Sequence, residues 1–498
     1  MQLKDCQNAD VVVVGAGNAA LCAALAAHEA GVRVVILEKA PESESGGNSY
    51  FTGGAFRIAH DNIGQLREVL DISEEEARTT DFGMYSESKF LDDVFKATEY
   101  RCDPDLVEIL VRQSRHTVSW LKRKGVRFEP TYHRQAVKVG TSFRFIGGQI
   151  CGASGEGEGL VQSQHALAQR AGVPILYDTA AVSLLYRAGQ VRGVVAASGQ
   201  EQREITAGAV VLACGGFESN AEMRARYLGP GWDLAKVRGT RYNMGDGIAM
   251  ALNIGAMPYG HWSGAHAVGW DLNAPPFGDR KIGDVFQKHS YPYGIMVNAN
   301  GERFVDEGSD FRNFTYAKYG QEILKQPGMF AWQIFDSKMT HLLRDQYRVR
   351  QVTKVEAMSL QELAQELEGV DKTRLLETIS KYNQAVRQDI PFDLAVKDGR
   401  CTVGLPIPKS NWANTIDTPP FQAYAVTCGI TCTFGGVQIS PRAAVQNVCG
   451  KDIPGLYAAG EMVGGLFYFN CPSGTGLVAG AVFGRIAGTE AARFCKHN

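Results

Sequence analysis

Neither sign of charge dominates this 498-residue sequence, which has 51 lysines and arginines, 53 aspartates and glutamates and a net charge of -2 at pH 7. A protein that binds nucleic acid through its phosphates needs a basic surface, so we expect no nucleic-acid partner. No apolar run approaches the ~20 residues of a transmembrane helix, so no membrane-spanning segment is predicted. The first ten residues carry acidic side chains and lead straight into a strand-like run, so we expect no signal peptide.

The sequence also lacks the cysteine patterns of metal and haem proteins. Its 11 cysteines include no CxxC pair for zinc or an iron–sulfur cluster and no CxxCH for attached haem. Cys428 and Cys432 form a CxxxC spacing, which we interpret as small thiols lining a pocket, and no metal site is predicted. Scattered cysteines favour reduced thiols over a disulfide framework, and together with the missing signal peptide they predict a cytoplasmic location.

A dinucleotide-binding motif is present near the N-terminus. Residues 11–38 run as an apolar strand, a glycine turn, a helix of small residues and a second strand that ends in an acid. Gly15 permits the tight turn, Gly17 lets the backbone approach a pyrophosphate, and Ala20 allows the helix to pack closely on the sheet. Glu38 stands where a carboxylate accepts a hydrogen bond from a ribose hydroxyl. The order of these elements predicts a βαβ unit that binds a dinucleotide.

Further glycine-rich turns recur along the chain, at spacings suited to loops that meet at one extended ligand. The loop at 46–54, GGNSYFTGG, offers amides that can line a pyrophosphate and a flat ring. A strand within 209–217 ends in ACGGF, where the backbone approaches a neighbour closely. Asp246 opens a helix, as a ligand or as its cap. Near the C-terminus a strand ends in Glu461, and Gly476 begins a helix that runs through Gly488 and whose N-terminus can face a ring carbonyl.

The middle of the chain differs in composition from both ends. Residues 258–425 are rich in aromatic residues and proline, which predicts a second domain inserted into the first. His261 and His266 lie in this aromatic part, and we interpret them as buried polar groups with satisfied hydrogen bonds. Helices are predicted from apolar periodicity over 103–124, 155–171 and about 359–388.

These motifs together resemble the FAD-dependent fumarate reductase/succinate dehydrogenase flavoprotein superfamily, which also contains 3-ketosteroid dehydrogenases. GGNS followed by Arg57 and His60, then RFVDEGSDF, PKSNWA and PSGTGL, are most similar to tricarballylate dehydrogenase within it. The resemblance implies an α/β fold with a Rossmann-like FAD-binding domain formed by residues 1–257 and 426–498. An α+β substrate-capping domain at 258–425 is inserted between these two parts.

The resemblance carries the family's FAD contacts over to the glycine-rich turns and their neighbours. No histidine in the loop after Glu38 can provide the ring attachment of the membrane-bound relatives, so FAD is expected to bind non-covalently. The predicted contacts are Gly15, Gly17, Asn18, Ala20, Glu38, Lys39, Gly46, Gly47, Asn48, Ser49, Thr52, Gly53, Gly54, Val182, Ala213, Cys214, Gly215, Asp246, Gly460, Glu461, Gly474, Thr475, Gly476 and Leu477.

The family's catalytic residues are only partly present. Its fumarate reductases use an arginine as acid, a glutamate as relay, and a histidine and a second arginine to hold the substrate. Glu307 matches the relay glutamate, whereas Thr340 stands in place of the acid arginine, with Lys338 two positions earlier. Cys432 and Cys471 stand in place of the substrate-binding histidine and arginine. Plain fumarate reduction is therefore not expected.

Other polar side chains must then handle protons and bind anions. If the substrate is anionic, we expect Arg57 together with Arg144 or Arg312 to hold its carboxylates. The predicted catalytic residues are Arg57, His60, Glu307, Arg312, Tyr316 and Lys338, and the predicted substrate pocket contains Arg144, Cys432 and Cys471.

The resemblance implies hydride transfer between a carbon atom and flavin N5, with proton transfer at the neighbouring carbon, next to a carboxylate or carbonyl. The leading substrate is a tricarballylate-like polycarboxylate. The alternatives are a ketone desaturase resembling 3-ketosteroid dehydrogenase, a flavoprotein oxidase or monooxygenase, and an electron-transfer module without a small substrate. The large inserted domain argues against the last. Without a haem, cluster or second dinucleotide motif, electrons are expected to pass to an external acceptor, quinone-linked or protein.

Overall fold

The computed structural model describes residues 7–145 and 148–497, so part of the N-terminal segment on which the signal-peptide expectation rests lies outside it. Two compact units are present, one formed by Met1–Asp233, Gly239–Ala265 and Cys432–Asn498, the other by Leu234–Arg238 and His266–Thr431. The predicted domain boundaries lie a few residues from the positions where the chain passes from one unit to the other. They remain a prediction. Of the helices in the described part of the chain, none has both the length and the apolar character needed to cross a bilayer.

The core of the first unit is an eight-stranded sheet built on the apolar run near the N-terminus. β1 pairs in parallel with β2 and β12, and β12 pairs in parallel with β20. Val11–Val14 are buried, as expected for a central strand covered on both faces. The segments that follow these parallel strands meet at one edge, which is where open α/β sheets bind ligands. The strands in sheet order are β10 (Ala180–Arg187), β11 (Gln190–Ser198), β12 (Glu201–Leu212), β1 (Asn8–Val14), β2 (Val34–Leu37) and β9 (Ile175–Leu176), with β20 (Asp452–Ala458) beside β12 and β19 (Ala444–Gln446) beside β20.

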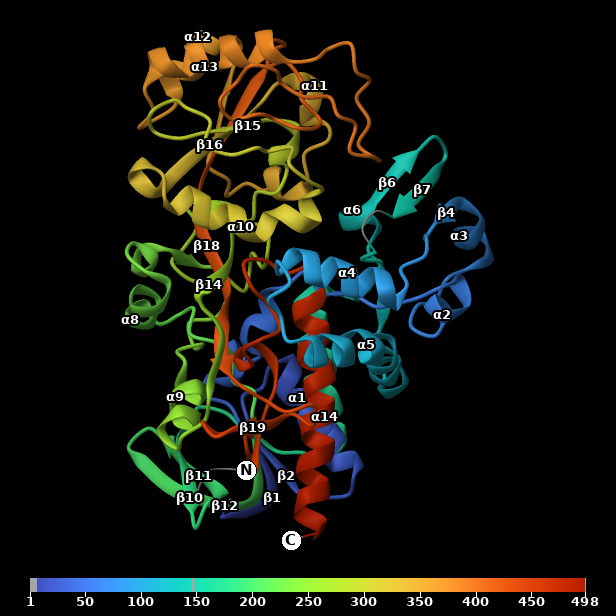
Figure 1. Cartoon of the computed structure of the whole chain (residues 1–498), viewed down its shortest axis with the longest axis vertical. Helices are drawn as coiled ribbons and strands as arrows, with labels where there is room; N and C mark the ends of the chain where they lie inside the picture. Colours follow the sequence, from blue (N-terminus) through green and yellow to red (C-terminus); the bar gives the residue numbers. More distant parts are fainter. Residues whose placement is uncertain (1–6, 146–147, 498) are drawn as a thin grey trace. The chain divides into compact units, whose positions relative to one another are not determined.

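Two helices from opposite ends of the chain lie side by side in this unit. α1 (Asn18–Glu29) follows β1, and α14 (Thr475–His497) runs beyond the end at Gly488 that the sequence had indicated (Figure 1). Glycines at every fourth position of α14 allow close contact. A Cβ at Gly484 would lie 2.3 Å from the carbonyl oxygen of Ala19, and one at Gly488 would lie 2.0 Å from that of Ala23. Only glycine fits such an approach of two helix backbones.

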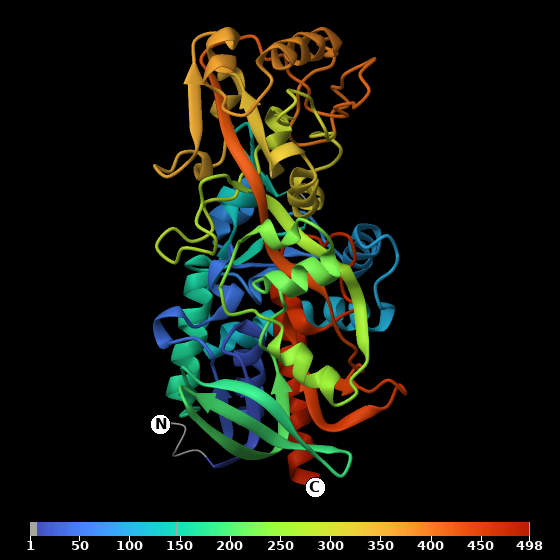
Figure 2. The ribbon, with the colours of Figure 1, turned by 90° about the vertical axis from the view of Figure 1, so that its left-hand side faces the viewer.

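Figure 2 shows the long strands β10–β12 of the eight-stranded sheet (teal to green) from a second side. The remaining elements of the first unit surround this sheet. The helices predicted at 103–124 and 155–171 are found as α5 and α7. The longer helices are α4 (Glu87–Ala97), α5 (Pro104–Lys124), α7 (Glu156–Arg170) and α9 (Asp246–Asn253). The short helices are η2 (Glu42–Glu44), η3 (Gly47–Phe51), α2 (Ile63–Arg67), α3 (Glu74–Thr79), α6 (Tyr132–Gln135), α8 (Ala221–Met223), η4 (Arg224–Leu228), η5 (Trp232–Leu234, whose last residue belongs to the second unit) and η9 (Gly460–Met462). Two small sheets contain β3 (Ala55–Phe56), β8 (Cys151–Ala153) and β5 (Phe128–Pro130), and β4 (Thr80–Asp81), β7 (Ser142–Phe145) and β6 (Ala136–Val139).

The second unit is built on a separate sheet. The predicted helical stretch near 359–388 is two helices, α12 and α13, separated by a turn at Gly369, whose φ of +71° is left-handed. Leu363 of α12 and Ile379 of α13 pack in one apolar core with Ile334. The strands are β13 (Lys236–Val237), β18 (Phe421–Val437), β16 (Phe330–Phe335) and β15 (Ile295–Val297), with β14 (Pro258–Asp271) and β17 (Lys354–Ala357) also paired to β18. β14 belongs to this unit from His266 on, and β18 belongs to it up to Thr431. The helices are η6 (Tyr291–Tyr293), α10 (Arg312–Leu324), η7 (Pro327–Met329), α11 (Ser337–Thr340), η8 (Asp345–Tyr347), α12 (Leu360–Glu366) and α13 (Lys372–Ala385).

Candidate active site

The glycine turn after β1 has the geometry that the sequence predicts. Gly15 has a φ of +104°, and a Cβ there would lie 2.5 Å from the carbonyl oxygen of Ala213 at the end of β12. Its amide donates to the carbonyl of Leu37 at 2.7 Å. Gly17 precedes the first turn of α1 in an extended conformation. The turn is therefore held against the ends of β2 and β12, with the N-terminus of α1 open to an anionic group.

Glu38 follows β2 and is buried beside this turn. Its carboxylate accepts hydrogen bonds from the amides of Ala16 and Ala40, both at 2.8 Å. Burial raises the pKa of Glu38, and the two amides partly oppose this effect. A carboxylate fixed by two amides still has lone pairs for a further donor, which fits the predicted bond to a ribose hydroxyl.

The glycine-rich loop after Glu38 forms the helix η3 and closes over the same edge. The hydroxyl of Ser49 accepts from the amide of Asn18 at 3.0 Å, and the amide of Gly157 donates to the carbonyl of Thr52 at 3.0 Å. Among the residues that the structure describes, no atom would lie within 4 Å of a Cβ at Gly47. The loop is thus attached to both α1 and α7 and leaves open space at one glycine, as a cofactor cradle requires.

A pair of buried glutamates lies beside these loops. Glu461, which follows β20, accepts from the amide of Thr433 at 2.9 Å. Glu218 accepts from the side-chain amides of Asn48 at 2.6 Å and Asn243 at 2.5 Å. Burial raises the pKa of both carboxyls, and the neighbouring Glu461 charge pushes the pKa of Glu218 well above its usual range. Burial and the neighbouring charge both favour the protonated form of Glu218. The sequence analysis missed Glu218, whose one local signal is its position directly after a glycine turn.

Arg57 is fully buried at the turn that precedes α14. Its Nε donates to the carbonyl of Ser473 at 2.8 Å and its Nη1 to the hydroxyl of Tyr85 at 2.7 Å. Asp93 lies 3.9 Å from Nη1 and accepts from the same hydroxyl at 2.7 Å. The backbone amide of Arg57 donates to the carbonyl of Gly474 at 3.0 Å. These contacts position the Ser473–Gly474 turn and hence the first turn of α14.

The other predicted residues of this unit occupy different surroundings. His60 is buried, and burial lowers its pKa. Burial raises the pKa of Cys471 to about 12, so this thiol is neutral, and Cys432 is half-buried. Arg144 lies on β7, about half exposed, and pairs with Asp81 at 3.0 Å. None of these contacts tests the predicted roles, which remain predictions.

The remaining predicted FAD contacts also belong to the first unit. Lys39 and Asp246 form an exposed ion pair at 2.7 Å, and Asp246 is the first residue of α9, with Gly245 at the cap position. Val182 lies on β10 and is 44% exposed. The side chain of Asn18 donates to the carbonyl of Leu477 at 2.8 Å, which joins the start of α1 to the start of α14.

The second unit contains the other predicted catalytic residues. Glu307 is buried and forms a two-bond ion pair with Arg303, at 3.1 Å to Nε and 2.5 Å to Nη2, while it also accepts from the amide of Met296. Lys338 contacts the carboxylates of Asp336, at 2.7 Å, and Asp417. Burial lowers the pKa of Lys338, but these carboxylates outweigh it and raise the pKa. Lys338 is therefore charged, and its ion pairs join the segment at Asp336 to the segment at Asp417.

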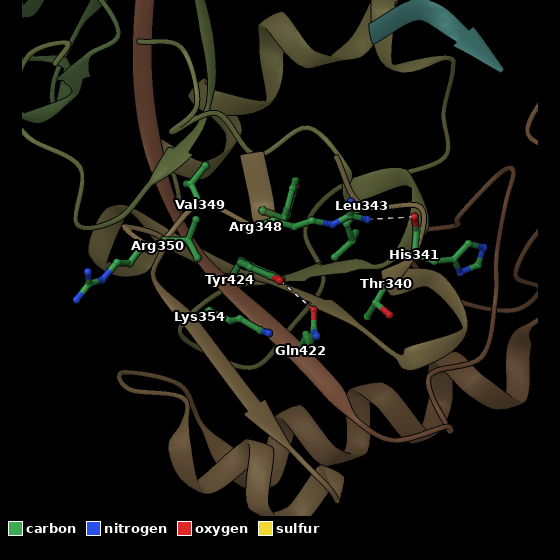
Figure 3. Close-up of a pocket in the computed structure, with 11 residues that line it drawn as sticks. Thr340, His341, Leu343, Arg348, Val349, Arg350, Lys354, Gln422 and Tyr424 are labelled. Carbon is green, nitrogen blue, oxygen red and sulfur yellow. Dashed lines mark hydrogen bonds between the residues drawn. The ribbon is translucent and has the colours of Figure 1, made fainter. Parts of the chain in front are cut away.

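Thr340, which is predicted to stand in place of the family's acid arginine, lines a pocket of about 590 Å³ in the second unit (Figure 3). Gln422 and Tyr424 form its floor and share a hydrogen bond of 2.9 Å. Arg348 donates to the carbonyl of His341 at 3.3 Å, and Arg350 extends away from the other side chains. The lining residues are Thr340, His341, Leu343, Tyr347, Arg348, Val349, Arg350, Val352, Lys354, Gln422 and Tyr424.

Comparison with known proteins decides the family. A model described as an FAD binding domain matches residues 10–477. The chain belongs to this FAD-binding family. A probable fumarate reductase of Shewanella frigidimarina is 30% identical to the flavoprotein over 495 residues, 98% of this chain and 75% of the relative. A 3-oxosteroid 1-dehydrogenase of Mycobacterium tuberculosis is 26% identical over 568 residues, 97% of this chain and 98% of the relative.

Solved structures agree with this assignment. The open conformation of a flavocytochrome c3 fumarate reductase has a TM-score of 0.72 at 28% identity, covering 98% of the flavoprotein and 79% of that chain. A 3-ketosteroid Δ1-dehydrogenase from Sterolibacterium denitrificans shares the fold, with a TM-score of 0.75 at 21% identity over 98% of this chain and all of that one. The predicted α/β fold, the FAD cofactor and the class of FAD-dependent dehydrogenase or reductase are confirmed. The fixed Glu38 carboxylate and the Gly15 turn fit FAD.

Substituting Glu38 with alanine is expected to weaken FAD binding roughly 5- to 50-fold, because it removes a ribose acceptor and leaves two amides unpaired. The dissociation constant is measured by quenching of flavin fluorescence on titration of the apoprotein. Glu42→Ala, an exposed glutamate of the same loop, is the matched control and should bind FAD as the wild type does. Equal affinity in the Glu38 variant would show that this carboxylate does not hold the ribose.

FAD is expected to come off the flavoprotein when it is denatured in acid, since residues 39–54 contain no histidine for attachment to the ring. The yellow chromophore should appear in the supernatant after precipitation. Colour that stays with the washed pellet would contradict non-covalent binding.

Proposed function

We propose that this flavoprotein catalyses dehydrogenation or reduction of a C–C bond next to a carboxylate or carbonyl, with a tricarballylate-like polycarboxylate as its leading substrate. Several relatives are named for reactions at such bonds, among them fumarate and acrylate oxidoreductases and 3-oxosteroid dehydrogenases. Bound FAD supplies the hydride acceptor or donor. The polypeptide has to orient the substrate, exclude water and move one proton.

The buried Arg303–Glu307 ion pair is the observation that carries the proposal. Glu307 matches the family's relay glutamate, is shielded from water, and is held by both Arg303 and the amide of Met296. A carboxylate in this position can pass a proton while the guanidinium balances its charge. Lys338 is held by two carboxylates, which makes it less suited to proton transfer than Glu307.

Arg57 is proposed as a positioning residue. Its side chain donates to Ser473 and Tyr85, lies 3.9 Å from Asp93 and is fully buried, so its clearest task is to hold the turn before α14. The electron acceptor is proposed to be a quinone-linked or protein partner, in line with the missing second dinucleotide motif.

Anaerobic mixing of the oxidised holoenzyme with a panel of compounds tests the proposed function. Tricarballylate and succinate represent polycarboxylates, and a 3-ketosteroid represents neutral ketones. Bleaching of the flavin by tricarballylate, with little bleaching by succinate or the steroid, is the expected result. Bleaching by the steroid alone would favour a ketone desaturase, which is supported by the neutral thiol of Cys471 at the position where the family resemblance implies a carboxylate-binding arginine.

Rapid stoichiometric turnover with dissolved oxygen alone would support the alternative of an oxidase instead. The dithionite-reduced enzyme should therefore be mixed with aerated buffer and, separately, with a quinone analogue. Faster reoxidation by the quinone is expected.

A further inference from the structure

Glu218 follows the glycine turn after β12 and is fully buried in the first unit. Its Oε1 accepts from the side-chain amides of Asn48 at 2.6 Å and Asn243 at 2.5 Å. Within residues 7–145 and 148–497, its Oε2 has no hydrogen-bond partner. One oxygen of this carboxyl therefore accepts two hydrogen bonds, while the other accepts none.

The second unit also contains unpartnered buried atoms, around the ring of Tyr316. Among the described residues, Nδ1 of His266 and Nε2 of His289 have no hydrogen-bond partner. Both imidazole rings meet the ring of Tyr316 edge to face, with centroids 5.0 Å away. The guanidinium carbon of Arg312, which begins α10, lies 5.4 Å from the centroid of the same ring.

The expectation that His261 and His266 are satisfied buried groups is therefore wrong for His266. His261 does accept a hydrogen bond, from the amide of Phe469 at 3.1 Å. A neutral imidazole can stay unpartnered at a lower cost than a carboxylate, because the carboxylate bears a charge. The carboxyl of Glu218 is thus the unpartnered group whose burial most needs a physical reason.

Glu461 is the acidic neighbour of Glu218. Its Oε1 accepts from the amide of Thr433 at 2.9 Å, and a Cβ at Gly216 would lie 2.1 Å from the same oxygen, so only glycine fits there. Burial raises the pKa of Glu218 most, and the charge of Glu461 and a hydrogen bond between the two carboxyls raise it further. Two carboxyls can hydrogen bond to each other only when one of them carries a proton. Such a proton can also satisfy Oε2 of Glu218.

The surroundings of the two carboxyls do not balance two negative charges. Neither carboxyl forms an ion pair in the part of the chain that the structure describes, and each acts on the pKa of the other. Arg224 on η4 is the buried cation of this segment, and its guanidinium donates to the backbone carbonyls of Glu218 at 2.5 Å and Trp232 at 2.8 Å. Burying a second charge beside the first costs more than burying one charge and one neutral acid.

Glu218 also joins three segments that carry predicted FAD contacts. Asn48 belongs to the glycine-rich loop after Glu38, and Asn243 precedes α9. Glu461 follows β20 and is partly exposed, whereas Glu218 is not. FAD bound at the predicted contacts would cover the accessible part of Glu461 and separate both carboxyls from water.

We propose that Glu218 and Glu461 share one proton, and that FAD binds the form of the protein that carries it. Glu218 is then a positioning residue, which holds Asn48 and Asn243 in place while one negative charge, instead of two, is buried. FAD that covers Glu461 removes the water that would stabilise a second charge, so binding at alkaline pH takes up one proton from the solvent. Neither the substrate nor the electron acceptor enters into this linkage.

Release of FAD from the holoenzyme at different pH values tests this linkage. Wild type and Glu218→Gln are diluted into buffers from about pH 6 to about pH 10, and the Kd is obtained from the FAD that passes an ultrafiltration membrane. The wild-type Kd should be constant at low pH and rise about tenfold for each pH unit once the shared proton is lost. Glutamine keeps an oxygen for the two asparagines and donates permanently to Glu461. Glu218→Gln should therefore match the wild type at low pH and bind FAD about 10-fold or more tightly than the wild type at the alkaline end.

Two further variants separate proton sharing from simple packing. Glu218→Ala removes the acceptor of Asn48 and Asn243 and should weaken FAD binding about tenfold at low pH. Glu222→Gln, at an exposed glutamate of α8 that pairs with Arg226, is the matched control and should follow the wild-type curve. Parallel pH curves of the wild type and Glu218→Gln would overturn the proposal, and so would weaker binding by Glu218→Gln over the whole range.

Infrared spectra of the wild-type holoenzyme keep the proposal testable if the glutamine variant does not fold. A shared proton gives the carbonyl stretch of a protonated carboxylic acid near neutral pH, and this band should shift in heavy water. The band should disappear over the pH range in which FAD is released. Absence of such a band near neutral pH would overturn the proposal.

Discussion

Substitution of Gly488 by alanine is expected to lower the free energy of unfolding by about 2–3 kcal/mol and to release FAD. The new Cβ would lie 2.0 Å from the carbonyl oxygen of Ala23, and since this atom belongs to the backbone of α1, no side-chain rotation can relieve the clash. The cost of overpacking exceeds the ~1 kcal/mol that alanine gains over glycine in a helix. Displacement of α1 would also move the Gly15 turn that cradles the cofactor. Urea denaturation followed by flavin fluorescence measures both effects.

Gly480→Ala is the matched control on the same face of α14. Its Cβ would lie 3.3 Å from the side-chain nitrogen of Asn18 and 3.5 Å from the Cβ of Ala19, which small shifts can accommodate. The helix propensity of alanine should then leave this variant as stable as the wild type or slightly more stable. Equal stability of the Gly480 and Gly488 variants would mean that the two helices do not approach as closely as described.

Arg57→Ala is expected to lower kcat/KM about 100-fold with the compound that bleaches the wild-type flavin, because a buried cation with several partners contributes a few kcal/mol. The free energy of unfolding should also fall, by about 3 kcal/mol, since Asp93 and the carbonyl of Ser473 lose their buried partner. Steady-state kinetics and urea denaturation measure the two losses. Arg57→Lys should restore little of the activity or of the stability. A single ammonium nitrogen cannot take the place of the two guanidinium nitrogens that donate to Ser473 and Tyr85.

Cys471→Ser, near the same turn, is the comparison for Arg57. The thiol is neutral and buried, and an isosteric hydroxyl should reduce kcat/KM by less than about 10-fold. If Cys471→Ser abolished turnover while Arg57→Ala retained it, the role given to Arg57 would be wrong. A ketone substrate with the thiol in the chemistry would then explain the site better.

The cofactor edge could be predicted from the sequence because its determinants are local. Gly15, Gly17 and Glu38 lie within one strand, helix and strand, and their spacing alone fixes which backbone atoms meet at the sheet edge. The structure has the turn at Gly15 and places Glu38 beside it, where two amides hold the carboxylate; that these residues bind FAD stays a prediction. Helix ends were less predictable: α14 continues past Gly488, and a left-handed Gly369 divides one expected helical stretch into two.

The buried polar clusters could not be predicted, since long-range packing creates them. Glu218 and Glu461 are far apart in the sequence, and their pKa values rise because the fold buries them together. His289 belongs to no motif, and only the folded chain places the ring of Tyr316 on α10 beside it. The departures from the family pattern at Cys432 and Cys471 predict only that an anionic substrate would be bound by other residues.

The pairing of α1 with α14 has a consequence for how the protein is made. Asn18 bonds to Leu477 across 459 positions of the chain, so α14 cannot cover the sheet edge around Gly15 until synthesis has passed α14. Closing so long a loop is slow, and the exposed N-terminal strands are open to aggregation in the meantime. Expression of the flavoprotein should therefore depend on chaperones and on the supply of FAD late in synthesis. Chains that stall before α14 should be degraded rather than accumulate as a stable fragment.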